Sequence, residues 1–232
     1  LNAYLSPMTD IIMASNGYLD KYEGDAIMAE WGVPYPLEDH ATRACWAALD
    51  QQALIAELAP GFKKKFGVDV MARMGLNSGI VSAGNMGSEK RFSYTVMGDA
   101  VNQAARFEPA NKDYETLIMI GESTYDLAKN DIEARLLDKI IVKGKTVPIQ
   151  VYELVAKKGE IRDNQRRVLE LYDLGLKVHW KRSFKEAIDY FEQAVTIIPD
   201  DGPSLAMIER VKKYIHVPPP DTWQGEFART TK

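Results

Sequence analysis

The sequence is short of cysteine and has no long apolar run. Cys45 is the only cysteine among 232 residues, so the chain can form no internal disulfide and no cysteine-based zinc cluster. A lone cysteine within the apolar run 41–49 is expected to be buried, and it fits a reducing cytoplasm. No run approaches the roughly 18 apolar residues that cross a bilayer, so we expect no membrane contact by this segment. We therefore predict a cytoplasmic chain, or the cytoplasmic part of a membrane-anchored parent protein.

The sequence also lacks an excess of positive charge. Its 29 Lys and Arg residues are outnumbered by 33 Asp and Glu residues, which gives a net charge of −4. Without a dominant basic field, we expect no nucleic-acid partner. A small phosphate-bearing ligand is still compatible with this balance, because a few well-placed Lys and Arg residues are enough to bind it.

Helical and strand-like patterns alternate along the first part of the chain. The spacing of apolar residues predicts helices over residues 1–15, 39–58, 100–107 and 123–129. A hairpin is predicted over residues 18–31, and further strands over 68–78, 93–97, 117–120, 136–142 and 149–154. This interleaving favours an α+β fold with a mainly antiparallel sheet and flanking helices.

The pattern changes after a charged linker at residues 157–160. Residues 162–198 are helical only, and Leu174, Gly175, Ala187, Phe191, Ala194 and Pro199 stand at the spacings of one tetratricopeptide repeat. We therefore divide the chain into residues 1–156 and a small all-α extension, residues 157–232, with a Pro-rich end at 218–220. One repeat cannot bury its own apolar face, so it is expected to pack on residues 1–156 or on a partner.

Two short segments carry candidate chemistry. Residues 19–29 place Asp25 after Gly24 at the hairpin turn, where a carboxylate can hold a hard cation; from this segment alone, an ordinary turn is the favoured interpretation. In residues 91–106, Asn102 and Arg106 are four apart and share one face of the predicted helix. That face could hold a ribose and a phosphate oxygen, or it could be an ordinary solvated surface.

Taken together, these two segments resemble the signature of the class III nucleotidyl cyclase catalytic domain over roughly residues 1–155. The resemblance implies a ferredoxin-like cyclase domain, active as a homodimer with its active sites at the interface. It also implies a role for each matching residue: Lys21 and Thr95 read the base, Asn102 orients the ribose, Arg106 stabilises the transition state and Asp25 is the second of two metal ligands. In a third segment, residues 141–145, which resembles a P-loop only superficially, the family resemblance implies that Lys143 contacts the terminal phosphates. Two ions per site, Mg²⁺ or Mn²⁺, are implied as cofactors.

The choice of base follows from hydrogen-bonding chemistry. Adenine offers a ring-nitrogen acceptor and an amino donor, which a Lys and a Thr hydroxyl can satisfy, whereas guanine would suit an acidic residue at position 21. Lys21 and Thr95 therefore favour an adenylate cyclase that converts ATP to 3′,5′-cyclic AMP and pyrophosphate in signal transduction. A guanylate cyclase is the alternative within the same family.

The sequence departs from the family at its first metal ligand. That Asp belongs to a strand before the first predicted helix, and the strand is absent from this sequence; Asp10 and Asp20 are poor substitutes. We favour an N-terminally truncated cyclase. The alternative is a catalytically impaired cyclase-fold dimer that acts as a nucleotide-binding or interaction scaffold.

Overall fold

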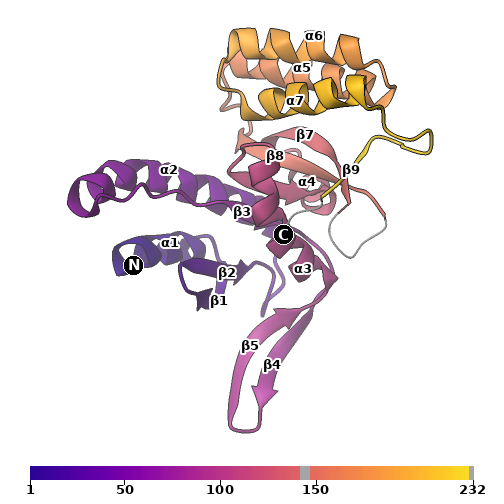
Figure 1. Ribbon diagram of the computed structural model, residues 1–232. Helices are drawn as coiled ribbons and strands as arrows, with labels where there is room; N and C mark the ends of the chain where they lie inside the picture. Colours follow the sequence, from indigo (N-terminus) through magenta and orange to yellow (C-terminus); the bar gives the residue numbers. More distant parts are fainter. Residues whose placement is uncertain (142–146, 230–232) are drawn as a thin grey trace.

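The computed structural model describes residues 1–141 and 147–229 (Figure 1). Its helices are α1 (Asn2–Ala14), α2 (His40–Phe66), α3 (Asp99–Ala110), the 3-10 helix η1 (Asn111–Asp113), α4 (Glu122–Ala128), α5 (Asp163–Trp180), α6 (Phe184–Ile197) and α7 (Gly202–His216). Its strands are β1 (Tyr18–Glu23), β2 (Ala26–Glu30), β3 (Met74–Leu76), β4 (Ser82–Ser88), β5 (Arg91–Met97), β6 (Ile118–Gly121), β7 (Ile132–Ile141), β8 (Ile149–Lys157) and β9 (Glu226–Ala228).

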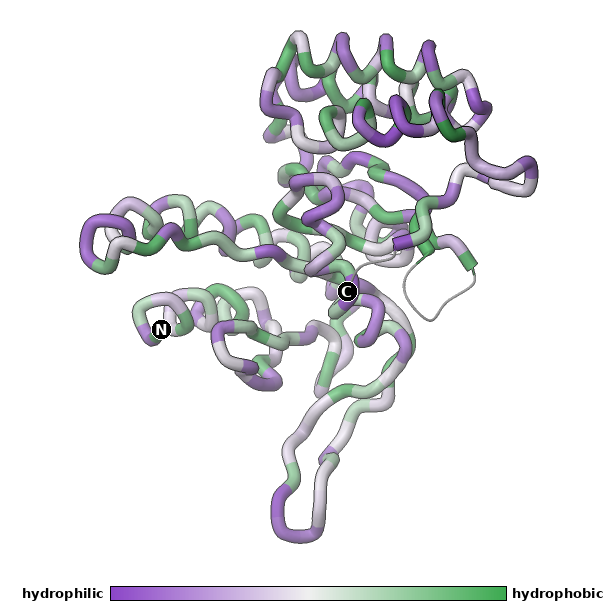
Figure 2. Tube along the Cα trace, in the orientation of Figure 1, coloured by the Kyte–Doolittle hydropathy of each residue, from purple (hydrophilic) through white to green (hydrophobic). Residues whose placement is uncertain are grey.

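The central sheet has five strands in the order β3-β6-β8-β7-β9. β8 pairs antiparallel with β6 and β7, while β3 pairs parallel with β6 and β9 pairs parallel with β7. The hairpins β1–β2 and β4–β5 are separate, and β4–β5 projects from the body as an arm with a hydrophilic tip (Figures 1 and 2). The predicted α+β class is confirmed, with a central sheet of mixed direction.

The largest departures from the predicted boundaries are at the second helix and at the strand after it; β7 also begins at Ile132 instead of residue 136, and β4 was not predicted. The sequence predicts that the second helix ends at residue 58, but α2 continues through Pro60 to Phe66, where Gly67 adopts a left-handed conformation with φ of 69°. Lys63, Lys64 and Lys65 occupy its last turn and oppose the negative end of the helix dipole. The strand predicted over residues 68–78 is reduced to β3. Within the described residues, no helix has the length and apolar character needed to span a membrane.

The C-terminal extension packs on the central sheet and shares its hydrophobic core. One buried cluster contains Leu137 and Ile140 of β7 together with Tyr172 of α5 and Phe191 of α6. The Tyr172 hydroxyl donates a hydrogen bond of 2.9 Å to the carbonyl of Leu137. The extension therefore buries its apolar face against residues 1–156, one of the two outcomes expected for a single repeat.

Two buried ion pairs also cross this boundary. Arg135 of β7 donates to both carboxylate oxygens of Asp201, each at 2.8 Å, and Arg210 of α7 pairs with Asp138 of β7. Burial raises the pKa of Asp138, and the charge of Arg210 opposes that rise. Each pair joins one charge of the sheet to one charge of the extension, and this directional contact fixes the extension in one position on the sheet.

The chain end returns to the sheet as a strap, residues 217–229. The guanidinium of Arg182 donates to the carbonyls of Pro219 and Pro220 at 2.5 and 3.0 Å, and the Trp223 ring meets His179 edge to face at 5.2 Å. The strap then forms β9, so the extension contains a short strand in addition to the predicted helices. β9 covers the outer edge of β7, which would otherwise present unpaired backbone groups.

Candidate functional site

Lys21 and Thr95 lie together although 73 residues separate them in the sequence. Thr95 is on β5 and Lys21 on β1, and both contact Asp20. The Thr95 hydroxyl donates to Oδ2 of Asp20, and the Lys21 ammonium lies 3.6 Å from Oδ1. The Asp20 side chain is 1% exposed, whereas that of Lys21 is 43% exposed. The predicted base-reading pair is therefore assembled within one chain by a buried carboxylate.

An irregularity in β1 explains how neighbouring residues reach the same group. Leu19 pairs with Ala29 and Lys21 pairs with Met28, so Asp20 is an extra residue in the strand. Such a bulge breaks the alternation that would send Asp20 and Lys21 to opposite faces. Tyr18 packs edge to face on Tyr94 at 5.5 Å and holds β1 against β5. The sequence gives no sign of this bulge, and the role of Asp20 was missed for that reason.

Glu30 is a second carboxyl group in this region that sequence reasoning missed. Both of its carboxyl oxygens are buried and have no hydrogen-bond partner among the described residues. Burial, and then the charge of Asp20, raise the pKa of Glu30 to about 7, and Lys21 opposes the shift. This region therefore contains two adjacent acids, of which Glu30 exchanges its proton near neutral pH.

The predicted metal ligand, Asp25, lies at the turn between β1 and β2. It is exposed and follows Gly24, whose φ is 70°. The charge of Asp25 contributes to a raised pKa of Tyr4 on α1, although burial is the larger cause. The described residues contain no group of three or more His, Cys, Asp or Glu side chains that could hold a metal ion. Asp25 can thus supply one oxygen ligand to a hard cation.

Asn102 and Arg106 lie one turn apart on α3, as the sequence predicts. Gly75 lets this helix approach β3 closely, since a Cβ at Gly75 would lie 2.2 Å from the carbonyl oxygen of Ala104. Asn102 is exposed in the first turn. Arg106 is half-buried, and its Nη1 is buried with no hydrogen-bond partner among the described residues. An unpaired buried donor on a cation is costly, so this guanidinium is suited to an anionic ligand.

Lys143, the remaining predicted site residue, lies outside the described residues. The strand before it, β7, ends at Ile141. A pocket of about 150 Å³ lies beside α3, lined by Asn77, Gln103, Phe107, Gly121, Glu122, Ser123, Ile149 and Gln150. Gln103 and Phe107 directly follow Asn102 and Arg106, so this hollow adjoins the helix that carries both predicted catalytic residues.

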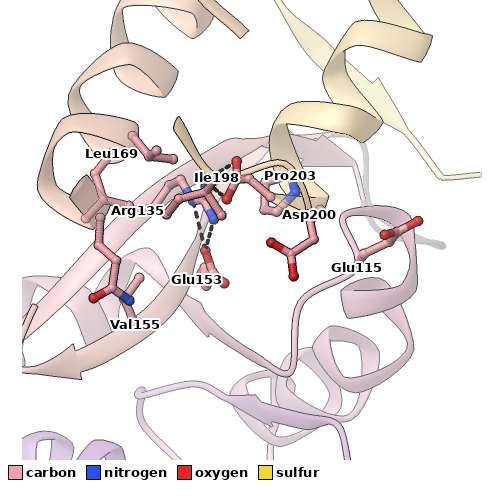
Figure 3. Close-up of a pocket in the computed structure, with 12 residues that line it drawn as sticks. Glu115, Arg135, Glu153, Val155, Leu169, Ile198, Asp200 and Pro203 are labelled. Atoms are coloured by element: carbon pink, nitrogen blue, oxygen red, sulfur yellow. Dashed lines mark hydrogen bonds and ion pairs between the residues drawn. The ribbon is translucent and has the colours of Figure 1, made fainter. Parts of the chain in front are cut away.

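A larger pocket of about 290 Å³ lies elsewhere, at the junction with the extension (Figure 3). Arg135 crosses it and binds Glu153 at 2.6 Å in addition to Asp201. Glu115 and Asp200 also line it, so acidic side chains outnumber the single Arg. An acidic lining with its one cation already paired is poorly suited to a nucleotide. The predicted site residues do not line this pocket.

Comparison with known proteins identifies the family of this chain. Residues 1–156 match the family model "Adenylate and Guanylate cyclase catalytic domain". The chain is 32% identical over 218 residues to the terminal-differentiation specific adenylate cyclase of Dictyostelium discoideum, covering 90% of this chain and 10% of that protein. Overall, the chain spans 10–32% of the length of the curated adenylate cyclases that it matches.

Solved structures give the same result. The adenylyl cyclase CyaB from P. aeruginosa is 30% identical with a TM-score of 0.63, over 69% of this chain and 83% of that chain. The guanylate cyclase domain of RhGC from Catenaria anguillulae, solved in complex with GTP, is 33% identical with a TM-score of 0.57, over 68% of this chain and 82% of that chain. The family model alone covers more than half of the sequence. The chain therefore belongs to the adenylate and guanylate cyclase catalytic domain family.

Proposed function

We propose that this chain is the catalytic part of an adenylate cyclase that converts ATP to 3′,5′-cyclic AMP and pyrophosphate in signal transduction. The observation that carries the proposal is the meeting of Lys21 and Thr95 at one buried carboxylate, Asp20. A Lys donor beside a hydroxyl matches the ring nitrogen and amino group of adenine. The adenylate cyclases among the relatives support this choice of base, and the guanylate cyclase relative makes GTP the competing substrate.

In the proposed reaction, the ribose 3′-hydroxyl releases its proton to water, and its oxygen forms a bond to the α-phosphorus while the bond from that phosphorus to the pyrophosphate oxygen breaks. Asn102 would orient the ribose, and Arg106 would stabilise the charge that develops on the phosphoryl oxygens, for which its unpartnered Nη1 is available. Lys143 would contact the terminal phosphates. Most of the catalytic work of these side chains is positioning and charge stabilisation.

Mg²⁺ or Mn²⁺, two ions per site, is the proposed cofactor, and Asp25 is the residue of this chain that would bind it. The exposed carboxylate of Asp25 is a hard oxygen ligand of the type these ions prefer, but the described residues do not assemble a complete metal site. When bound, such ions activate the attacking hydroxyl and neutralise the leaving pyrophosphate. Water, the nucleotide phosphates or a second chain would supply further ligands.

We also propose a homodimer and a tetratricopeptide-like extension. The two sequence units, residues 1–156 and 157–232, differ in pattern but share one hydrophobic core in the described residues, which supports their folding together. The Dictyostelium match covers 90% of the chain and so must run past residue 156, which supports a common origin for part of the extension. Within the dimer, the active sites would lie at the interface.

A direct assay tests the proposed function. The full-length protein is incubated with ATP or GTP and with Mg²⁺ or Mn²⁺, and cyclic nucleotide and pyrophosphate are measured together. We expect cyclic AMP and pyrophosphate in equal amounts, with GTP a poor substrate. A preference for GTP would identify a guanylate cyclase. Intact dimers that bind nucleotide but form neither product would favour the scaffold.

A further inference from the structure

We propose that Asp20 is a positioning residue that sets the base specificity of this site, by fixing the direction of the Thr95 hydrogen bond and the place of the Lys21 ammonium. The inference rests on the proposed function of Lys21 and Thr95 as base-reading residues. The Asp20 side chain is 1% exposed and contacts both Lys21 and Thr95. It therefore acts on the base through Lys21 and Thr95.

The chemistry begins with the hydroxyl of Thr95. A free hydroxyl rotates and can either donate or accept a hydrogen bond. On its own, it is therefore compatible with both adenine and guanine. A carboxylate can only accept, which means that the Thr95 hydrogen is committed to Oδ2 of Asp20. The lone pairs of the Thr95 oxygen are then the only groups left for a ligand. Asp20 thereby converts the Thr95 hydroxyl from a group that can donate or accept a hydrogen bond into one that can only accept.

The pair then has a fixed polarity: an acceptor at Thr95 and a donor at Lys21. Adenine presents an amino donor and a ring-nitrogen acceptor side by side, which is the complementary pattern. Guanine in the same pose would place its carbonyl oxygen against the Thr95 oxygen and its ring N–H against the Lys21 ammonium. Both contacts leave polar groups unpaired, and sites of this kind reject the wrong ligand strongly.

The surrounding structure keeps this arrangement in place. The bulge in β1 lets Asp20 face Thr95 while Lys21 remains 43% exposed and able to reach a ligand. The ion pair of 3.6 Å draws the flexible Lys21 side chain toward Thr95. Thr95 is 7% exposed, so its side chain has little freedom to turn away from Asp20.

Asp20→Asn tests the proposal, because the amide keeps the size of the side chain but can donate to Thr95. The hydroxyl can then rotate and donate to a ligand. In the full-length protein, we expect the ratio of kcat/KM for ATP to that for GTP to fall by about tenfold or more, the effect of one mismatched hydrogen bond. Asp173→Asn, which removes an exposed carboxylate paired with Lys177, is the matched control and should leave the ratio unchanged.

Thr95→Val provides an independent test and a coupling measurement. Removing the hydroxyl should lower the ratio in the native background and have little further effect on it in the Asp20→Asn background, since both changes remove the same directed acceptor. If Asp20→Asn does not fold, Thr95→Val and Thr95→Ser provide the test. We expect the preference for ATP over GTP in kcat/KM to be lost in Thr95→Val and kept in Thr95→Ser. A folded Asp20→Asn protein with the native ratio, or a Thr95→Val protein with the native ratio, would overturn the proposal.

The ratio of dissociation constants for ATP and GTP, measured by equilibrium dialysis, separates this inference from the proposed reaction. If the native protein forms no cyclic AMP but binds ATP more tightly than GTP, and Asp20→Asn loses that preference, the proposed reaction is refuted and the proposed role of Asp20 is supported. If the native protein forms cyclic AMP and the preference survives in Asp20→Asn, the reaction stands and the role of Asp20 fails. A native protein that prefers GTP refutes both.

Discussion

At the scale of single residues, Glu30 shows how an otherwise ordinary side chain becomes sensitive to pH. It lies on β2 with both carboxyl oxygens buried and unpaired among the described residues, and Asp20 and Lys21 are the charged groups that act on it. Burial is the main cause of its raised pKa of about 7. The folded protein therefore retains a proton on Glu30 over a pH range in which the unfolded chain has released it.

We predict that Glu30→Gln stabilises the protein at high pH. The folded pKa is about 7 and the reference value is 4.5, so ionisation of Glu30 costs stability progressively as pH rises from 4.5 to 7, and the full penalty remains above 7. Relative to the native chain, the free energy of unfolding of the variant should be higher by on the order of 1–2 kcal/mol above pH 7, allowing for partial solvent screening. Below pH 4.5 the two free energies should be equal. Urea unfolding across this range measures the difference. The exposed Glu23→Gln on β1 is the control, and the same pH dependence there would contradict the assignment.

Arg106→Ala gives a second prediction at this scale. If Arg106 contacts the phosphoryl oxygens only as charge develops on them, its removal should reduce kcat for cyclic AMP formation by about 10²–10³, with a smaller change in KM. Arg73→Ala is the control: it removes a partly exposed ion pair with Glu108, which lies on α3 with Arg106. It should change kcat by less than about threefold. A near-normal rate in Arg106→Ala would refute the assigned role.

At the scale of the elements, helix packing gives the same substitution, Gly→Ala, opposite effects on stability at two positions. A Cβ on Gly175 of α5 would lie 2.7 Å from the ring of Phe191 on α6, whereas a Cβ on Gly61 of α2 would meet nothing within 4 Å. Gly175→Ala should therefore destabilise by about 1–2 kcal/mol net of its gain in helix propensity, and Gly61→Ala should stabilise by about 0.5–1 kcal/mol. Chemical denaturation measures both. Stabilisation by both changes would show that α5 and α6 can separate at little cost.

The same scale shows what the sequence could predict. Asn102 and Arg106 were placed correctly because spacing along one helix is a local property. The short strand β9 was not predicted, since three residues that pair with a strand more than 80 positions earlier carry no local pattern. The length of α2 was underestimated because Pro60 usually ends a helix. The roles of Asp20 and Glu30 depend on a bulge and on burial, which arise only when β1, β2 and β5 come together.

At the scale of the whole molecule, the shared core and the buried ion pairs imply one cooperative folding unit. Separating residues 1–156 from the extension would expose Leu137 and Ile140 and leave Arg135 and Asp138 without their partners Asp201 and Arg210. Each of those two apolar side chains would lose about 1.5–3 kcal/mol of burial free energy, a large share of the stability of a typical domain. The N-terminal unit alone should therefore fold poorly.

The distribution of tryptophan provides a test of this cooperativity. Trp31 and Trp46 lie in residues 1–156, while Trp180 and Trp223 lie in the extension. We prepare two variants, each with one of these pairs replaced by Phe, and unfold each in urea while following fluorescence and far-ultraviolet circular dichroism. The two signals should share one midpoint within each variant. An earlier fluorescence transition for the extension pair would show that it unfolds independently.

The position of β9 in the sequence also matters while the protein is being made. The other four strands of the central sheet are complete in sequence by residue 157, but β9 begins at residue 226. A growing chain on the ribosome therefore presents an uncovered β7 edge until the extension has been translated and folded back. A product of premature termination within residues 158–225 keeps that edge open and is prone to pair with other chains. Synthesis of the strap is therefore the step that closes the open edge of β7.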